Sequence, residues 1–332
     1  MPILGSIIKQ VITVSGKIPV RRSTYKQQVR ELRKLMLKAQ FTEFGKKYEF
    51  NELILLQDPI KIFQNTVPLH DYQSIFDAWW HRTLKGEKDI CWPGKIKYFA
   101  LSSGTAESSS KHIPVTKNLL KAIHKGTIKQ ILSTKHLNLS KEQYETEILF
   151  VGGSTNLSYN GTYFSGDLSG ITTGTQPRWF QNFTLPGPGI TSLDSWEEKI
   201  QEIVLNAKNW DIGFICGVPA WIQILFERII KYYKVKNIHE VWPNLAILVH
   251  GGVAIHPYKA SIDQLCGKPI HYLDTYLASE GFIAYQERPN KHQAMKLMTD
   301  NKIFFEFIPF TEKNFDADGN LLPNATALDL SQ

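Results

Sequence analysis

A stretch rich in serine and glycine near residue 100 carries side chains suited to holding phosphate groups. Its members are Ser102, Ser103, Gly104 and Thr105, with Lys111 a little further along the chain. Hydroxyls and backbone N–H groups donate hydrogen bonds to phosphate oxygens, a glycine permits close approach, and a lysine adds a mobile positive charge. The stretch has no G-K-S/T sequence, which excludes a P-loop and indicates a different nucleotide fold. A serine-rich surface loop is the alternative interpretation.

A second stretch, residues 275–281, combines an aromatic ring with hydroxyls and a carboxylate. Its candidates are Thr275, Tyr276, Ser279 and Glu280. A tyrosine ring can stack on adenine, a hydroxyl can reach a phosphate, and a carboxylate can hold Mg²⁺. On its own the stretch fits better a core tyrosine beside a solvated glutamate, but together with the serine-rich stretch it favours a nucleotide site.

A third stretch pairs two glycines after a run of β-branched residues. It consists of His250, Gly251, Gly252 and Val253. Paired glycines leave room for a flat base beside the backbone. An ordinary strand-to-helix turn is the alternative interpretation.

Short runs of β-branched and aromatic residues alternate with helical patterns along the chain. Strands are expected at residues 97–101, 148–151, 212–216, 245–249, 270–273 and 303–308. Helices are expected at residues 24–44, from Thr116 onward and at 220–233, because apolar residues recur there at steps of three and four. Strands that alternate with helices predict an α/β fold with mostly parallel sheets flanked by helices.

Glycines gather where these strands are expected to end. Gly152, Gly153, Gly217, Gly251 and Gly252 each come just after a strand, and residues 276–281 follow another. Ligands of open α/β sheets bind in the crevice outside the carboxyl ends of the strands. Loops that are far apart in the sequence are therefore expected to share one site.

The charge of the chain is uneven. The formal net charge is +7, and residues 1–150 hold 24 Lys and Arg against 13 Asp and Glu. A basic half suits nucleotide phosphates, nucleic acid or an acidic membrane surface, although a solvated helix face is the commoner meaning of scattered lysines. A nucleic-acid or membrane-surface module that merely binds nucleotide is thus a second alternative. The sequence lacks the repeat of arginine and aromatic residues that would support it.

Cysteine usage and hydropathy favour the cytoplasm. Cys91, Cys216 and Cys266 are too few and too widely spaced for a disulfide framework or a structural metal site. No run of about 18 apolar residues occurs, so no membrane span is expected. We expect a cytoplasmic protein, a monomer, that binds neither nucleic acid nor membrane.

The motifs together resemble those of the auxin-responsive Gretchen Hagen 3 family of acyl acid-amido synthetases. The resemblance rests on S-S-G-T, K-x-I-P-V-T, H-G-G-V and T-Y-x-A-S-E-G in this order. Further matches lie at residues 67–72, 92–94, 166–170 and 305–309. The implied fold is the large N-terminal domain of the acyl-adenylate (acetyl-CoA synthetase-like) fold. It would comprise a helical region at 1–90, a nucleotide-binding core at 91–310 and an approach to a hinge at 311–332.

The resemblance also implies roles for the motif residues. The 102–105 loop would hold phosphates, residues 251–253 and Tyr276 would border adenine, Ser279 would lie near the α-phosphate, and Glu280 would coordinate Mg²⁺. Two departures stand out. Residues 106–108 replace a glycine-richer stretch, and Gln332 ends the chain before the small domain and the ribose-binding aspartate of the family.

The expected reaction uses ATP and Mg²⁺ to activate a small carboxylic acid as an acyl-adenylate. An amino acid would then displace AMP to give an amide, with Lys111 and Glu280 offsetting phosphate charge. Transfer to coenzyme A, as in acyl-CoA ligases, is the close alternative. The acyl pocket is expected to involve Trp221, His250, Ile171 and Trp179, each of which fits a core position equally well.

Overall fold

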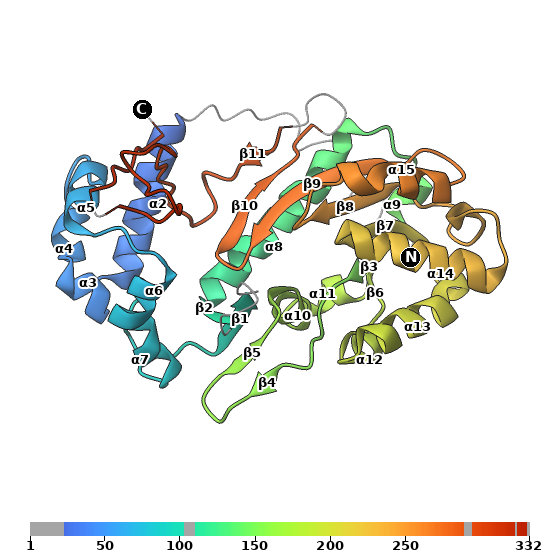
Figure 1. The fold of residues 1–332 in the computed structure, drawn as a ribbon, viewed down its shortest axis with the longest axis horizontal. Helices are drawn as coiled ribbons and strands as arrows, with labels where there is room; N and C mark the ends of the chain where they lie inside the picture. Colours follow the sequence, from blue (N-terminus) through green and yellow to red (C-terminus); the bar gives the residue numbers. More distant parts are fainter. Residues whose placement is uncertain (1–22, 103–109, 289–293, 323, 331–332) are drawn as a thin grey trace.

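The computed structural model describes residues 23–102, 110–288, 294–322 and 324–330. Small helices form one side of the molecule, and two β-sheets with their covering helices form the rest (Figure 1). The phosphate-loop candidates Ser103, Gly104 and Thr105 lie outside the described residues. Within the described part of the chain, no helix is both long and apolar enough to cross a membrane.

The helical side is built from short elements that share one core. They are α2 (Thr24–Ala39), α3 (Glu43–Lys47), α4 (Phe50–Leu53), α5 (Ile60–Thr66), α6 (Tyr72–Ile75), the π-helical turn η1 (Phe76–Trp80) and α7 (His81–Leu84). Leu32 and Met36 of α2 are buried against Trp79 in this core. The prediction of a single helix over 24–44 is wrong at its C-terminal end, because α2 ends at Ala39. The chain turns after Ala39, and the Thr42 hydroxyl caps α3 by accepting a hydrogen bond from Gly45 N.

The smaller sheet has four strands in the order β2-β1-β5-β4. Its strands are β1 (Tyr98–Ser102), β2 (Lys111–Val115), β4 (Ser158–Tyr159) and β5 (Phe164–Gly166). β1 pairs antiparallel with β2 and parallel with β5. This sheet is mixed, so the expectation of parallel pairing does not apply to it.

The larger sheet has seven strands in the order β11-β10-β9-β8-β7-β3-β6. Its strands are β3 (Glu147–Val151), β6 (Thr184–Leu185), β7 (Ile212–Gly217), β8 (Ile247–Gly251), β9 (His271–Ala278), β10 (Gly281–Tyr285) and β11 (Lys296–Leu297). Neighbours from β6 to β9 are parallel, and the β9–β10 hairpin is antiparallel. The strands expected at 97–101, 148–151, 212–216, 245–249 and 270–273 are confirmed with shifted ends.

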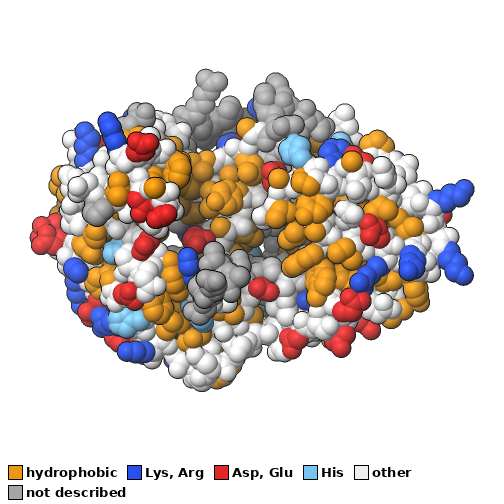
Figure 2. Space-filling view, in the orientation of Figure 1, with side chains coloured by type: hydrophobic (Ala, Val, Ile, Leu, Met, Phe, Trp, Pro, Cys, Tyr) orange, Lys and Arg blue, Asp and Glu red, His pale blue; other side chains and the backbone are white. Residues whose placement is uncertain are grey.

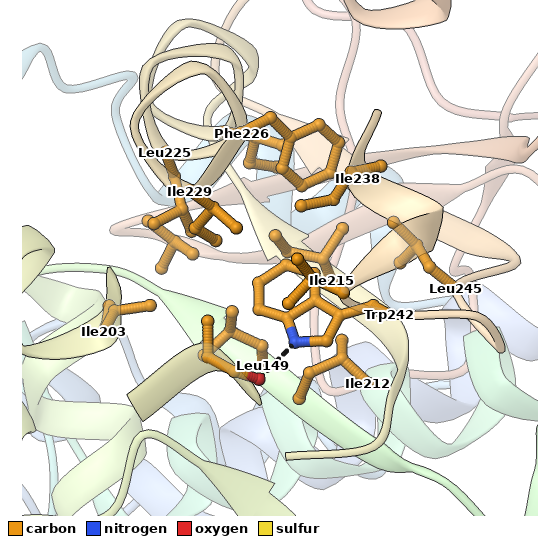
Figure 3. Packing of buried hydrophobic residues seen from close by; sticks show 14 of the residues in the cluster. Leu149, Ile203, Ile212, Ile215, Leu225, Phe226, Ile229, Ile238, Trp242 and Leu245 are labelled. Carbon is orange, nitrogen blue, oxygen red and sulfur yellow. Dashed lines mark hydrogen bonds between the residues drawn. The ribbon is translucent and has the colours of Figure 1, made fainter. Parts of the chain in front are cut away.

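Helices cover both faces of the larger sheet. One face carries α13 (Trp196–Asn206), α14 (Pro219–Tyr233) and α15 (His256–Leu265), whose apolar side chains share a core with Leu149, Ile215 and Trp242 (Figure 3). α8 (Lys117–Ser133), α10 (Leu168–Gly174) and α11 (Arg178–Gln181) lie toward the other face. Shorter elements are η2 (Thr134–His136), α9 (Lys141–Tyr144), α12 (Pro188–Thr191), η3 (Ala207–Asn209) and η4 (Ile238–Glu240).

The chain reverses its direction of travel across the larger sheet at β3. It goes from β3 to β6 on one side and then returns to β7 on the other, from which it continues to β8 and β9. Such a reversal is a topological switch point, where a crevice opens at the carboxyl ends of the strands. The expected position of the site, at the glycine-rich strand ends, therefore coincides with the crevice that the topology creates.

The strand expected at 303–308 is wrong. Only one isolated antiparallel bridge, Phe307 to Leu328, occurs there among the described residues. A side chain takes the place of a strand partner, because the buried Gln28 of α2 donates to Ile303 O (3.2 Å) and accepts from Phe305 N (2.7 Å). The C-terminal segment consequently lies along the helical side, next to α2 and α5 in Figure 1.

Replacement of Gln28 by leucine is expected to lower the free energy of unfolding by about 1–3 kcal/mol, the cost of leaving buried backbone groups unpaired. Gln40→Leu, at the end of the same helix, is the matched control, since its amide bonds Leu37 O within its own turn. Urea unfolding of both variants measures the difference. Equal stabilities would mean that Gln28 does not hold the 303–305 segment.

Candidate functional site

A cavity of about 470 Å³ lies between α8, α10 and the larger sheet. Its walls are mainly apolar and include Ile128, Ile148, Phe150, Phe214 and Leu273. Figure 2 shows hydrophobic side chains gathered around the hollowed middle of one face of the molecule. A volume of this size, lined by apolar groups with a few polar ones, is typical of small-molecule sites.

The paired glycines border this cavity at the carboxyl end of β8. Gly251 lies beside Thr275 of β9, and a Cβ at Gly251 would come within 2.4 Å of Thr275 O. Gly252 has a φ of +80°, in the left-handed region that favours glycine. Gly251, Gly252 and Thr275 all line the cavity. The exposed side chain of Val253 does not belong to the lining.

The glycine turn after β3 closes another part of the cavity wall. Gly153 N donates to Ser169 Oγ (2.9 Å), and a Cβ at Gly153 would come within 2.4 Å of the Asp167 carboxylate. The stretch at 166–170 thus contributes Asp167 and Ser169 to the cavity wall. Beneath it, the buried Lys199 donates to Gly152 O (3.2 Å). Burial lowers the pKa of Lys199, while Asp167 and Asp194 act in the opposite direction.

Residues 276–281, which were expected to follow the strand at 270–273, are themselves largely strand. β9 runs on to Ala278, because β10 pairs with it on the side away from β8, and only Ser279 and Glu280 form the turn. Since side chains alternate along a strand, Thr275 and Leu277 face the cavity while Tyr276 lies on the other face and is 51% exposed. The ring of Tyr276 is therefore accessible for stacking by a planar ligand near the carboxyl end of β9.

Ser102 and Lys111 are direct partners at the ends of β1 and β2. Lys111 is exposed, and its Nζ lies 5.2 Å from the centre of the Tyr72 ring. Tyr72 also accepts a hydrogen bond from His112 N (2.9 Å). Tyr72, from the family-like stretch at 67–72, thus contacts both β2 and the ammonium group of Lys111, a residue that follows the phosphate-loop candidates in the sequence.

The variant Tyr72→Leu is expected to weaken ATP binding about two- to fivefold, since it removes the cation–π contact with Lys111. Tyr72→Phe keeps the ring and should stay close to the native affinity. Adenosine lacks phosphate and should bind all three proteins alike. Calorimetric titration with ATP and with adenosine tests this, and an equal loss of adenosine affinity would contradict it.

Glu280 lies apart from the apolar cavity. Glu280 lines a second cavity of about 240 Å³, together with Thr116, Asn118 and Trp92. Glu280 is exposed and forms no hydrogen bond or ion pair with any residue that the structure describes. Across those same residues, no three His, Cys, Asp or Glu side chains gather as a metal cluster. A single accessible carboxylate fits Mg²⁺, which usually keeps several waters and is held by one or two carboxylates plus phosphates.

The candidates for the acyl pocket divide into three groups. Trp221 and His250 line the apolar cavity. Ile171 does not line this cavity and is fully buried in the core between α8 and the smaller sheet. The side chain of Trp179 lies outside the described residues.

His250 is a buried polar residue of the cavity wall. Burial lowers its pKa, although the Asp274 carboxylate acts in the opposite direction. The distance from His250 Nδ1 to Asp274 Oδ1 is 3.6 Å, too long for a hydrogen bond. The imidazole is therefore neutral near pH 7.

Sequence reasoning missed the helical wall of the cavity. His124, Thr127, Ile128 and Ile131 of α8 line it. Their spacing of three and four residues is the signal that could have found them, but the same spacing also describes an ordinary core-facing stripe. Only the position of α8 over the sheet separates these two meanings.

Comparisons with known proteins identify the family and the fold of the chain. The model of the GH3 (Gretchen Hagen 3) family N-terminal domain matches residues 20–204. No curated protein sequence matches the chain.

Solved structures of adenylate-forming ligases share the fold at low identity. GH3.15 acyl acid amido synthetase superposes with a TM-score of 0.61 at 14% identity, over 83% of this chain and 57% of that one. AtGH3.15 acyl acid amido synthetase in complex with 2,4-DB gives 0.67 at 12%, over 91% and 60%. 2-Hydroxyisobutyryl-CoA ligase in complex with 2-HIB-AMP and CoA gives 0.50 at 14%, over 84% and 57%. The chain therefore has the fold expected from its motifs and spans about three fifths of these proteins.

Proposed function

The chain belongs to the GH3 family, as its motifs predicted, and from this premise we propose that it binds ATP and activates a carboxylic acid as an acyl-adenylate. The observation that carries the proposal is the apolar cavity that ends at Gly251, Gly252 and Thr275. The resemblance assigns this glycine turn to adenine binding. An acid bound in the cavity would thus lie next to a nucleotide bound at the carboxyl ends of the same strands.

In the proposed reaction a carboxylate oxygen attacks the α-phosphorus of ATP, and pyrophosphate leaves. The chain contributes chiefly by positioning and by offsetting negative charge. Lys111 and the Ser102 hydroxyl lie at the ends of β1 and β2, where they flank the phosphate-loop candidates. Glu280 would hold Mg²⁺, which supplies positive charge to the phosphates when bound.

Tyr276 and Ser279 complete the proposed nucleotide site from the β9–β10 hairpin. The exposed Tyr276 ring would stack on adenine, and Ser279 would lie close to the α-phosphate. Both residues are carried over from the family pattern. Their place in one hairpin beside Gly251 supports the assignment, because Gly251 pairs directly with Thr275 of the same strand.

We propose an amino acid as the acceptor, whose amine would displace AMP and form an amide. The acyl acid amido synthetases superpose on the chain better than the CoA ligase does, with TM-scores of 0.61 and 0.67 against 0.50. Transfer to coenzyme A is the competing outcome. It differs in the acceptor and leaves the roles of the nucleotide-site residues unchanged.

Pyrophosphate release from ATP across a panel of carboxylic acids, with and without amino acids or coenzyme A, tests the proposal. We expect release that depends on an acid, and an amide product when an amino acid is present. A thioester in place of an amide would support the ligase alternative. Salt-sensitive binding of nucleic acid or acidic vesicles without any acid-dependent reaction would instead favour a binding module.

A further inference from the structure

The wall of the apolar cavity carries a single ionised side chain. Among the described residues that line the cavity, Asp167 is the one Asp, Glu, Lys or Arg. Asp167 is also exposed, so that a ligand in the cavity can reach it. The few charged or polar groups of a mainly apolar pocket are those that fix the orientation of its ligand.

Asp167 stands at the N-cap of α10 but does not cap the helix. An aspartate in this position ordinarily accepts a hydrogen bond from a backbone N–H of the first helical turn. The side chain of Asp167 accepts none there, and it forms no hydrogen bond or ion pair with any residue that the structure describes. Its carboxylate is therefore free to accept hydrogen bonds from a ligand.

Two segments in close contact hold the carboxylate over the glycine turn after β3. A Cβ at Gly153 would come within 2.4 Å of Asp167 Oδ2. A Cβ at Gly170 would likewise come within 1.9 Å of Ser154 O. Gly153 N also donates to Ser169 Oγ (2.9 Å). The lack of a side chain at Gly153 thus leaves the space that the carboxylate occupies beside the cavity.

A buried lysine behind the turn offers another explanation for this charge. Lys199 donates to Gly152 O (3.2 Å), and both Asp167 and Asp194 raise its pKa against the effect of burial. Two carboxylates and one ammonium group still leave an excess of negative charge at this part of the wall. Charge balance with Lys199 alone therefore does not account for Asp167.

We propose that the cavity binds a molecule with an apolar body and a primary ammonium group, which Asp167 holds at the cavity wall. Like charges repel, so the carboxylate of a bound acid must point away from Asp167. The inference rests on the proposed function for the role of this molecule as a reactant. The ammonium group would belong either to the amine acceptor or to the acid itself.

Three probes of similar shape and different charge test the recognition without any reaction. They are phenethylamine, 2-phenylethanol and 3-phenylpropionate, titrated by calorimetry into the 332-residue chain at neutral pH, where the amine is protonated. Phenethylamine should bind about five- to tenfold more tightly than the neutral alcohol, and the anion should bind least tightly. High salt should reduce the preference for the amine, because salt screens accessible charges.

Two variants locate the preference. Asp167→Asn is nearly isosteric and removes the charge, and Gly153→Ala places a methyl group where the carboxylate lies. In both variants the preference for phenethylamine over 2-phenylethanol should fall toward one, and in Asp167→Asn the affinity for the alcohol should stay within about twofold. Asp77→Asn removes an exposed carboxylate from η1 and should leave the preference unchanged. Thermal unfolding checks that each variant folds.

Pyrophosphate release distinguishes the two sources of the ammonium group. The amino acid phenylalanine, which carries an ammonium group and a carboxylate, is supplied with ATP, either alone or together with phenylacetate. Release with the amino acid alone would assign the ammonium group to the acid. Release that requires phenylacetate and yields its amide would assign the group to the acceptor. The inference expects Asp167→Asn to weaken whichever of these reactions occurs.

Three results would overturn the inference. They are equal binding of phenethylamine and 2-phenylethanol, an unchanged preference in Asp167→Asn, and failure of all three probes to bind. Pyrophosphate release with carboxylic acids would then still support the proposed function. A preference that depends on Asp167, without any ATP-dependent reaction, would instead uphold the recognition of an ammonium group and reject adenylation.

Discussion

ATP binding by the Glu280→Gln variant is expected to be almost insensitive to Mg²⁺, whereas in the native chain Mg²⁺ should tighten it at least about tenfold. The amide nearly matches the carboxylate in shape but lacks the charge that holds a hard cation. The side chain is exposed and bonds no described residue, so the fold should not change. Calorimetric titration of ATP with Mg²⁺ and with EDTA measures the effect.

Glu87→Gln is the matched control for this experiment. Glu87 lines the same cavity as Glu280, but its carboxylate is paired with Arg82 Nη2 at 2.7 Å. A paired carboxylate is less available to a cation, so the Mg²⁺ dependence should survive in this variant. Loss of Mg²⁺ dependence in Glu87→Gln and its retention in Glu280→Gln would contradict the assignment and would make Glu87 the metal ligand instead.

The strand ends were predictable because two signals agree there. Runs such as 212–216 and 245–249 are mainly apolar and each holds two β-branched residues, and a glycine follows within two positions of each run. Parallel strands bring their carboxyl ends to the same side of the sheet, and Gly217 accordingly lies opposite His250, the residue before Gly251. The family motifs added the expected roles, and the neighbouring strands β8 and β9 carry two of these motifs, H-G-G-V and T-Y-x-A-S-E-G.

Other features depended on contacts that a single sequence does not show. Residues 303–308 have the composition of a strand, but the side chain of Gln28 bonds their backbone groups, Ile303 O and Phe305 N. Gln28 belongs to a helix more than 270 positions earlier in the chain. Tyr276 and Thr275 lie on opposite faces of the sheet because pairing with β10 makes this part of β9 a strand. The contribution of α8 to the cavity wall also depends on the fold, because His124 and Ile128 in isolation fit ordinary core-facing helix positions.

Deletion of the Trp242 indole should have the largest effect on stability. Trp242 is fully buried against Phe226, Ile215 and Leu149 in the core that supports β3 and β7 (Figure 3). Trp242→Ala is expected to lower the free energy of unfolding by about 3–5 kcal/mol, since it leaves a large cavity among close-packed side chains. Urea unfolding followed by circular dichroism measures this loss.

Trp242→Phe separates the hydrogen bond of the indole from its volume. The indole Nε1 donates to Ala207 O at 2.8 Å, and that carbonyl also accepts from Trp210 N, so it keeps a partner in either variant. Most of the loss in Trp242→Ala should therefore come from the cavity, and Trp242→Phe should lose only about 1–2 kcal/mol. Equal losses in the two variants would assign the effect to the hydrogen bond instead.

The position of Trp242 also predicts what this large destabilisation leaves intact. The indole packs on the sheet face that carries α13 and α14, whereas the apolar cavity lies on the face toward α8 and α10. Nucleotide and acid affinities of Trp242→Ala should thus stay within about threefold of the native values at temperatures where the variant is folded. A stability loss that is accompanied by a tenfold or greater loss of affinity would show that the two faces of the sheet are coupled, so that the core beneath β3 and β7 sets the geometry of the glycine turns above them.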